Sequence, residues 1–181
     1  MKRVLVLGAG LVARPLVRYL LDCPAFRVCV ASRTVEKARA LIGDHPRGEA
    51  LAFDMNEAAG LPALIAGCDL AISLLPWTYH LQVAEACLAQ RKHLVTTSYV
   101  QPAMRALDAA ARAAGVLFLN EIGLDPGIDH MSAMRVIERV RRAGGRIESF
   151  ASYCGGLPAP EANTNPFGYK FSWSPRGVLL A

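Results

Sequence analysis

Two side chains in this sequence combine proton chemistry with a favourable position. Tyr99 and Asp125 each follow a short apolar run, and a phenol or a carboxyl group placed there can accept or donate a proton in a reaction. The alternatives are that Tyr99 packs with its hydroxyl bonded, and that Asp125 caps a helix beginning near Gly127. A third such side chain, the thiol of Cys154, lies in a glycine-rich turn.

The N-terminal stretch carries a phosphate-binding pattern. Residues 8–13 read GAGLVA, a G-x-G-x-x-A motif between the apolar run Val4–Leu7 and a segment with helical periodicity. Gly8 permits a tight turn, Gly10 lets a pyrophosphate approach the backbone, and Ala13 lets helix and strand pack closely. The N–H groups and positive dipole end of the helix attract phosphate. The alternative is a glycine-rich turn with no ligand.

The end of the second expected strand indicates which dinucleotide is bound. Enzymes that prefer NAD carry Asp or Glu there, whereas this sequence has Ser32, Arg33 and Thr34. A guanidinium binds a 2′-phosphate through two hydrogen bonds, and the hydroxyls add further ones. The pattern therefore predicts NADP(H), the alternative being that Arg33 packs on the adenine or lies in solvent. Asp54 is expected near the adenine, and Leu75 on the nicotinamide side.

The elements that position these residues alternate along the chain. Six short apolar strands separated by helices predict an α/β, Rossmann-type, doubly wound parallel sheet with its ligand at the carboxyl ends of the strands. The expected strands are Val4–Leu7, Arg27–Ala31, Glu49–Phe53, Leu70–Leu74, Leu94–Thr96 and Val116–Leu119. The expected helices include Leu61–Ala66, Tyr79–Gln90, Pro102–Ala114 and a segment from about Thr34 to Ile42.

The character of the chain changes after Asn120. Ile128–Arg142 is expected to be a helix whose apolar positions, among them Met131 and Met134, pack in a core. Ile147–Tyr153 is expected to be a strand of a second, α+β unit. We therefore divide the chain into a dinucleotide-binding domain at 1–122 and the beginning of a substrate or dimerisation domain at 123–181. Since the chain stops inside an apolar run, we expect either the front part of a longer protein or a domain completed by a partner.

Composition restricts the class of protein. Of 181 residues, 53% are hydrophobic and 19% charged, as expected of a globular protein. The net charge is +5, but the Lys and Arg residues are scattered along the chain, so no nucleic-acid partner is expected. No apolar run is long enough to span a bilayer. Five cysteines without a C-x-x-C pair, and an N-terminus that enters a strand directly, predict a cytoplasmic protein without a signal peptide. No metal is expected, because no cluster has the spacing of metal ligands.

Several long blocks resemble one known family. The sequence is similar throughout, in order and spacing, to saccharopine dehydrogenase of the glutamate-forming type, also called saccharopine reductase. The blocks are GAGLVARP (8–15), SLLPWTYH (73–80), VTTSYVQPAM (95–104), NEIGLDPGIDH (120–130) and SYCGGLPAPEANTNPFGYKFSWSPRGVLLA (152–181). The resemblance implies an NADP-dependent oxidoreductase of lysine metabolism. NADPH would reduce the imine of glutamate and aminoadipate semialdehyde to saccharopine, or the reverse would occur. Members of the family are much longer than this chain.

The resemblance also implies roles for individual residues. Phosphate and ribose contacts would fall to Gly8, Ala9, Gly10, Leu11, Val12, Ser32, Arg33 and Thr34, with Asp54 and Met55 at the adenine. The nicotinamide side would be lined by Leu75, Thr97, Ser98, Leu124 and Pro126, and Trp173 would lie against the cofactor from the second domain. Ser98, Tyr99 and Asp125 would contact the amino-acid substrate.

Three functions remain open at this point. The first is the saccharopine reductase reaction, with a small amino-acid substrate and with scope for a homodimer through the second domain. The second is a related reductase that joins a different amine to an aldehyde, as in polyamine synthesis. The third is a truncated protein that binds nucleotide, or regulates or assembles, without catalysis.

Overall fold

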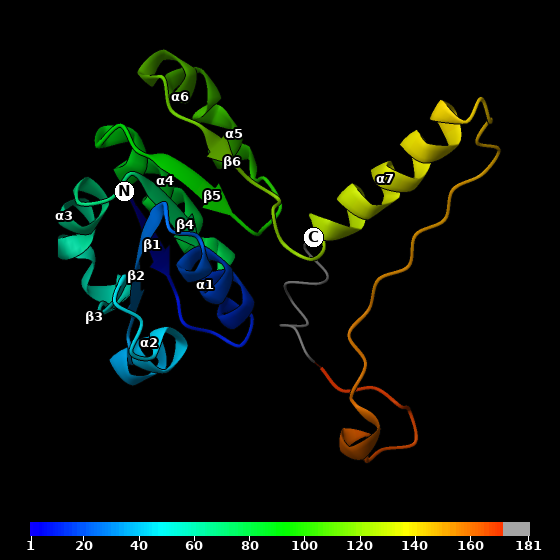
Figure 1. The fold of residues 1–181 in the computed structure, drawn as a ribbon, viewed down its shortest axis with the longest axis horizontal. Coiled ribbons are helices and arrows are strands. Elements are labelled where there is room, and N and C mark those ends of the chain that lie inside the picture. The colour runs from blue at the N-terminus through cyan, green and yellow to red at the C-terminus, as the bar shows by residue number, and fades with distance from the viewer. Residues whose placement is uncertain (172–181) are drawn as a thin grey trace. The chain divides into compact units, whose positions relative to one another are not determined.

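A computed structural model of the chain describes residues 1–171 and is shown in Figure 1. Contacts divide the chain into two units, Met1–Pro126 and Gly127–Ala181, called here the N-terminal and C-terminal units. Each is described by itself. Within the described residues, no helix is both long enough and apolar enough to cross a membrane.

The N-terminal unit is built on a parallel sheet. Its strands lie in the order β3-β2-β1-β4-β5-β6, so the chain starts in the middle, moves to one edge and then returns to build the other half. This is the strand order of dinucleotide-binding folds, and it confirms the predicted fold class. The strands are β1 (Lys2–Leu7), β2 (Phe26–Ser32), β3 (Gly48–Ala52), β4 (Leu70–Ser73), β5 (His93–Thr96) and β6 (Phe118–Leu119).

Helices cover both faces of the sheet (Figure 1). They are α1 (Ala13–Asp22), α2 (Val35–Ile42), α3 (Leu61–Ala66), α4 (His80–Ala89), α5 (Pro102–Ala106) and α6 (Asp108–Ala114), with 3-10 turns at Met55–Gly60 and Trp77–Tyr79. Because successive strand residues point to opposite faces, Val4 and Val6 pack with α1 and α2, whereas Leu5 and Leu7 pack with α3, α4 and α5. All four side chains are at most 1% exposed, as expected of a parallel sheet covered on both sides.

The second half of the N-terminal unit differs from the prediction in two details. The single helix expected at Pro102–Ala114 is two helices, because a tight turn at Leu107, whose N–H donates to the carbonyl of Met104, separates α5 from α6. The sixth strand is shorter than Val116–Leu119. The N–H of Val116 bonds back to the Ala111 carbonyl, and that of Leu117 donates to the imidazole of His93.

The described part of the C-terminal unit contains one long helix, α7 (Ile128–Arg142), and a 3-10 turn at Pro160–Ala162. The bounds of α7 are those predicted, but the expected core packing is wrong. No residue of this fully described helix is buried, and Met131 and Met134 are 54% and 47% exposed. The strand predicted at Ile147–Tyr153 is also wrong. The segment is irregular, because a strand needs a neighbouring strand for its backbone hydrogen bonds and residues 127–171 contain none.

Candidate functional site

The loop between β1 and α1 has the shape that the sequence motif predicts. Gly8 has a φ of 109°, which favours glycine, and a Cβ there would lie 3.2 Å from the carbonyl oxygen of Leu74. Gly10 faces open space, since a Cβ on it would meet nothing within 4 Å. Ala13 is fully buried, as close packing of helix on strand requires. The loop therefore leaves room at Gly10 for a ligand to approach the backbone.

The first turn of α1 suits an anion. Its N-cap residue is Val12, and no side chain among the described residues caps the helix. The first turn holds no acidic residue either, so its N–H groups and positive dipole end are not compensated by the chain itself. Leu11 and Val12 are strongly exposed beside it. These features fit the pyrophosphate of a dinucleotide.

The adenosine side is formed by the ends of β2 and β3. Arg33 and Thr34 are exposed directly after β2, and Ser32 is half-buried. Asp54 is half-buried two residues beyond β3, where its Oδ1 accepts the N–H of Asn56 at 2.9 Å. The side chain of Met55 belongs to the buried core at 7% exposure. No carboxylate follows β2 directly, so the residues present there fit a 2′-phosphate.

A buried histidine links the ends of β4 and β5. His80, the first residue of α4, is 5% exposed and lies with its Nδ1 2.9 Å from the Oγ of Ser73. Its Nε2 lies 2.9 Å from the Oγ of Ser98, two residues beyond β5. Both ring nitrogens are therefore engaged by hydroxyls. Burial lowers the pKa of His80 to about 4, so the ring is neutral at pH 7.

This lowered pKa predicts a dependence of stability on pH. In the unfolded chain His80 titrates near 6.5, its ordinary value, whereas in the folded chain it titrates near 4. Between these values the unfolded state binds more protons, so the free energy of unfolding falls as the pH drops through this window. From pH 7.5 to 4.5 we expect the wild type to lose about 2 kcal/mol more than His80→Asn, measured by urea unfolding. Equal losses would contradict a neutral, buried imidazole.

The ends of β5 and β6 are joined by side-chain and backbone bonds. Thr96, 1% exposed, donates from Oγ1 to the Oδ1 of Asn120 at 2.8 Å. The N–H of Ile122 donates to the Thr96 carbonyl, and Glu121 accepts the N–H of Val100 through Oε1 at 2.9 Å. The loops after these two strands are consequently held side by side.

Tyr99 and Asp125 meet in these loops. The Tyr99 hydroxyl donates to the Oδ1 of Asp125 at 3.1 Å, and both residues are exposed. Asp125 does not cap α7, because the helix begins after Gly127 and it is Asp129 that accepts the Gly127 N–H, at 2.9 Å. The capping alternative is therefore not what the structure shows. Gly123 holds the loop close to β5, since a Cβ there would lie 2.8 Å from the carbonyl oxygen of Thr97.

The predicted site residues of the N-terminal unit thus follow the carboxyl ends of the strands. Leu75 and Thr97 are half-buried, Leu124 is exposed and Pro126 is buried. Cys154 is exposed and lies in the C-terminal unit, and Trp173 falls outside the described residues. Among residues 1–171, His, Cys, Asp and Glu side chains form no group of three or more that could hold a metal ion.

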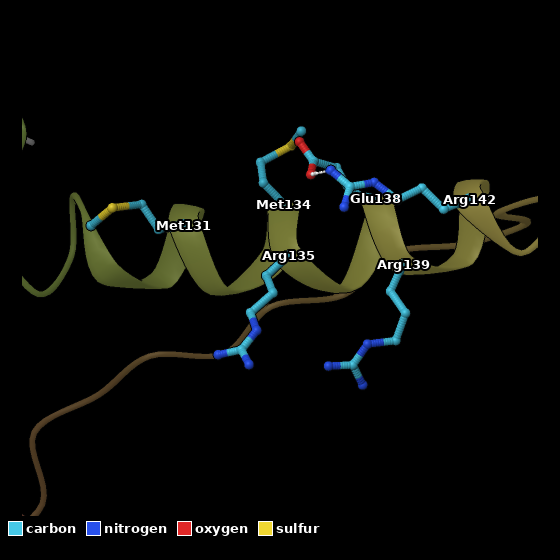
Figure 2. Close-up of a pocket in the computed structure, with 6 residues that line it drawn as sticks. All are labelled: Met131, Met134, Arg135, Glu138, Arg139 and Arg142. Atoms are coloured by element: carbon cyan, nitrogen blue, oxygen red, sulfur yellow. Dashed lines mark hydrogen bonds and ion pairs between the residues drawn. The ribbon is translucent and has the colours of Figure 1, made fainter.

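A concave surface lies on α7. Figure 2 shows that all its labelled lining residues come from this one helix, with Arg135 and Arg139 extending away from the side of Met134 and Glu138. Glu138 pairs with Arg142 at 3.0 Å, one turn further along. These residues form an open surface groove and include none of the predicted site residues.

The strand order, the glycine-rich loop after β1 and the arginine after β2 define the class of protein as a Rossmann-type dinucleotide-binding domain. The chain belongs to the saccharopine dehydrogenase family. Residues 4–119 match the saccharopine dehydrogenase NADP binding domain, and residues 123–181 match the saccharopine dehydrogenase C-terminal domain. The resemblance seen in the sequence is confirmed, as is the choice of an NADP-type domain.

Known proteins of this family match over the whole chain. Saccharopine dehydrogenase [NADP(+), L-glutamate-forming] of Pyricularia oryzae is 54% identical over 99% of the chain and 40% of its own length. The Schizosaccharomyces pombe protein of the same name is 52% identical over 100% of the chain and 40% of its own length. The solved structure of apo saccharopine dehydrogenase (L-Glu forming) from Saccharomyces cerevisiae has a TM-score of 0.82 and 47% identity, covering 100% of the chain and 40% of that protein. The chain therefore spans about 40% of the length of these relatives.

Proposed function

We propose that the chain binds NADP(H) and belongs to an enzyme that reduces the imine of glutamate and aminoadipate semialdehyde to saccharopine, or catalyses the reverse reaction. The observation that carries this proposal is the match, over essentially the whole chain, to fungal saccharopine dehydrogenases named as NADP-dependent and L-glutamate-forming. The open loop at Gly10 and the exposed Arg33 support the choice of cofactor.

When bound, the cofactor supplies or accepts a hydride. In this proposal, the loop from Gly8 to Val12 and the N-terminus of α1 hold its pyrophosphate. Ser32, Arg33 and Thr34 bind its 2′-phosphate, and Asp54 lies near its adenine. Leu75, Thr97, Ser98, Leu124 and Pro126 line the nicotinamide side. Holding the nicotinamide against an electrophilic carbon supplies much of the rate of hydride transfer.

Tyr99 and Asp125 handle protons in this proposal, and together with Ser98 they contact the amino-acid substrate. Forming an imine from an amine and an aldehyde requires proton transfers, first at nitrogen and then at the departing hydroxyl. The hydrogen bond between the two side chains supports a shared role, because a proton on the phenol and a lone pair on the carboxylate already face each other. A protonated imine is itself a good electrophile, so the hydride step needs little additional acid catalysis.

The Asp125→Asn change tests this role. We expect about a tenfold lower kcat for saccharopine formation, with a smaller change in the Kd of NADPH, because the amide accepts the Tyr99 hydroxyl but is a far weaker base. Asp108→Asn is the matched control, since it removes the same charge from an exposed pair with Arg112 on α6. An Asp125→Asn protein with the kcat of the control would show that the carboxylate does not carry the proton.

The reaction itself is tested by following NADPH absorbance with glutamate plus aminoadipate semialdehyde, against a panel of other amines. Oxidation that requires glutamate supports the proposal, whereas preference for another amine would favour the related reductase, such as a polyamine-pathway enzyme. Tight NADPH binding without turnover on any amine would instead favour a nucleotide-binding protein without catalysis.

We further propose a dinucleotide-binding domain at 1–122 and the beginning of a substrate domain at 123–181. Apolar residues exposed along α7, such as Met131, Met134 and Val136, support a homodimer through this second domain. A cytoplasmic location is supported by the buried cysteines Cys29, Cys68 and Cys87, which form no disulfide.

A further inference from the structure

We infer that His80 is a positioning residue, which holds the hydroxyl of Ser98 toward the nicotinamide half of the bound dinucleotide. The inference rests on the proposed binding of NADP(H) and adds to it a residue that contacts no ligand itself. The geometry that points to it is the bridge from Ser73 through the imidazole to Ser98, with 2.9 Å at each end.

The bridge fixes the plane of the imidazole. Ser73, the last residue of β4, is fully buried, and its Oγ lies beside Nδ1 of a ring that is itself 5% exposed. Ser98 follows β5, the strand that pairs with β4. The ring therefore spans two adjacent strand ends, and its orientation is determined from the buried side, away from any ligand.

A neutral imidazole has one N–H and one lone pair, so it donates to one serine and accepts from the other. In either tautomer the Oγ of Ser98 is held in place, because it donates its proton to Nε2 when Nδ1 carries the ring proton and accepts the Nε2 proton when Nε2 carries it. Both nitrogens are occupied by hydroxyls, which leaves neither available to exchange a proton with substrate. His80 therefore acts through Ser98 rather than as an acid or base.

The strand order indicates which part of the ligand Ser98 contacts. In this fold β1, β2 and β3 form the adenosine half of the site, and β4, β5 and β6 form the nicotinamide half. Ser98 lies in the loop after β5, and its carbonyl also accepts the N–H of Glu121, which follows β6. Its hydroxyl is thus expected to affect NADPH but not a ligand that lacks nicotinamide, such as adenosine 2′,5′-bisphosphate.

Two substitutions of His80 separate positioning from packing. The amide of Asn reaches about as far as Nδ1 and keeps the bond to Ser73, whereas the longer Gln places its amide near the position of Nε2, next to Ser98. We expect His80→Asn to raise the Kd of NADPH about fivefold, measured by fluorescence titration, and His80→Gln to restore most of the affinity. The Kd of adenosine 2′,5′-bisphosphate, measured by calorimetry, should not change in either variant.

A double-mutant cycle tests whether His80 acts through Ser98. Ser98→Ala should cost about as much NADPH affinity as His80→Asn, and the double variant should cost no more than Ser98→Ala alone. Ser73→Ala removes the anchor of the ring from the buried side and should give the same loss for NADPH only. It also keeps the test valid if a His80 variant fails to fold.

His93→Gln is the matched control, because it alters a histidine that accepts a backbone N–H, from Leu117, at the opposite end of β5. It should leave both Kd values unchanged. Equal weakening of both ligands by His80→Asn, or additive losses in the cycle, would overturn the positioning role. A wild-type chain that bound neither ligand would instead overturn the proposed cofactor, and this inference with it.

Discussion

The Gly10→Val chain is expected to fold like the wild type and to bind neither NADPH nor NADH. A Cβ at Gly10 has open space around it within 4 Å, so we expect the folded chain to accept a valine there. The same open space is where the pyrophosphate must approach the backbone in a G-x-G-x-x-A loop. We expect the Kd of both dinucleotides to rise by more than about 1000-fold, because a branched side chain occupies the position of the ligand. Calorimetric titration measures the affinity, and thermal unfolding shows that the fold is unchanged.

Valine substitutions at two other glycines separate loss of binding from loss of folding. Gly8→Val is expected to lower the melting temperature, because Gly8 has a positive φ and a Cβ there would crowd the Leu74 carbonyl. Gly67→Val is the matched control, since Gly67 has a helical backbone and would make only ordinary contacts. It lies just before β4, at the amino ends of the strands, whereas the loop lies at their carboxyl ends. Retained dinucleotide affinity in Gly10→Val would remove the argument from the motif.

The Arg33→Ala chain is expected to lose affinity for NADPH about 50-fold while its affinity for NADH changes less than about twofold. The guanidinium is exposed directly after β2, and among the described residues no hydrogen bond or ion pair engages it. It is therefore available to bind a 2′-phosphate, which NADH lacks. A charge-assisted, bidentate contact has an energy of about 1.5–3 kcal/mol, and this sets the size of the expected effect.

The control for Arg33→Ala is Arg27→Ala, which removes the same charge from an exposed position near the start of β2. Arg27 lies at the far end of the same strand, so its loss tests the general attraction between a basic chain and a phosphorylated ligand. Both titrations belong at about 0.15 M salt, where distant charges are screened. Equal losses for NADPH and NADH in Arg33→Ala would show that the guanidinium does not read the 2′-phosphate.

Most of the fold could be predicted from local patterns. Apolar runs and intervening helical segments locate all six strands of the N-terminal unit, and the helices Leu61–Ala66 and Ile128–Arg142 have the predicted bounds. The predictions that were wrong depend on which other segment an element packs against or pairs with, and a local pattern does not specify that segment. Residues 147–153 have the composition of a strand, but residues 127–171 contain no strand for them to pair with. The apolar positions of α7 have helical spacing, yet spacing does not reveal what they pack against.

The candidate site divides in the same way. The glycine-rich loop at 8–13 is one contiguous stretch and Arg33 directly follows a strand, so local sequence patterns are enough to propose them as site residues. The link from Ser73 through His80 to Ser98 and the bond between Thr96 and Asn120 join residues on different elements. They depend on the register of β4, β5 and β6, which no local motif specifies. In the sequence His80 stands only at the start of a helix, and the structure adds the two serines that its ring links.

The reversal of strand order between β1 and β4 has a consequence for how specificity is encoded. In the proposed site, the residues that contact the adenosine end all precede β4, whereas those that line the nicotinamide side follow it. The residues proposed to select the coenzyme and those proposed to act in the reaction thus lie in two consecutive parts of the sequence. Exchanging residues 32–34 is therefore expected to change the preference between NADP(H) and NAD(H) without changing the reaction, so the two properties can be redesigned separately.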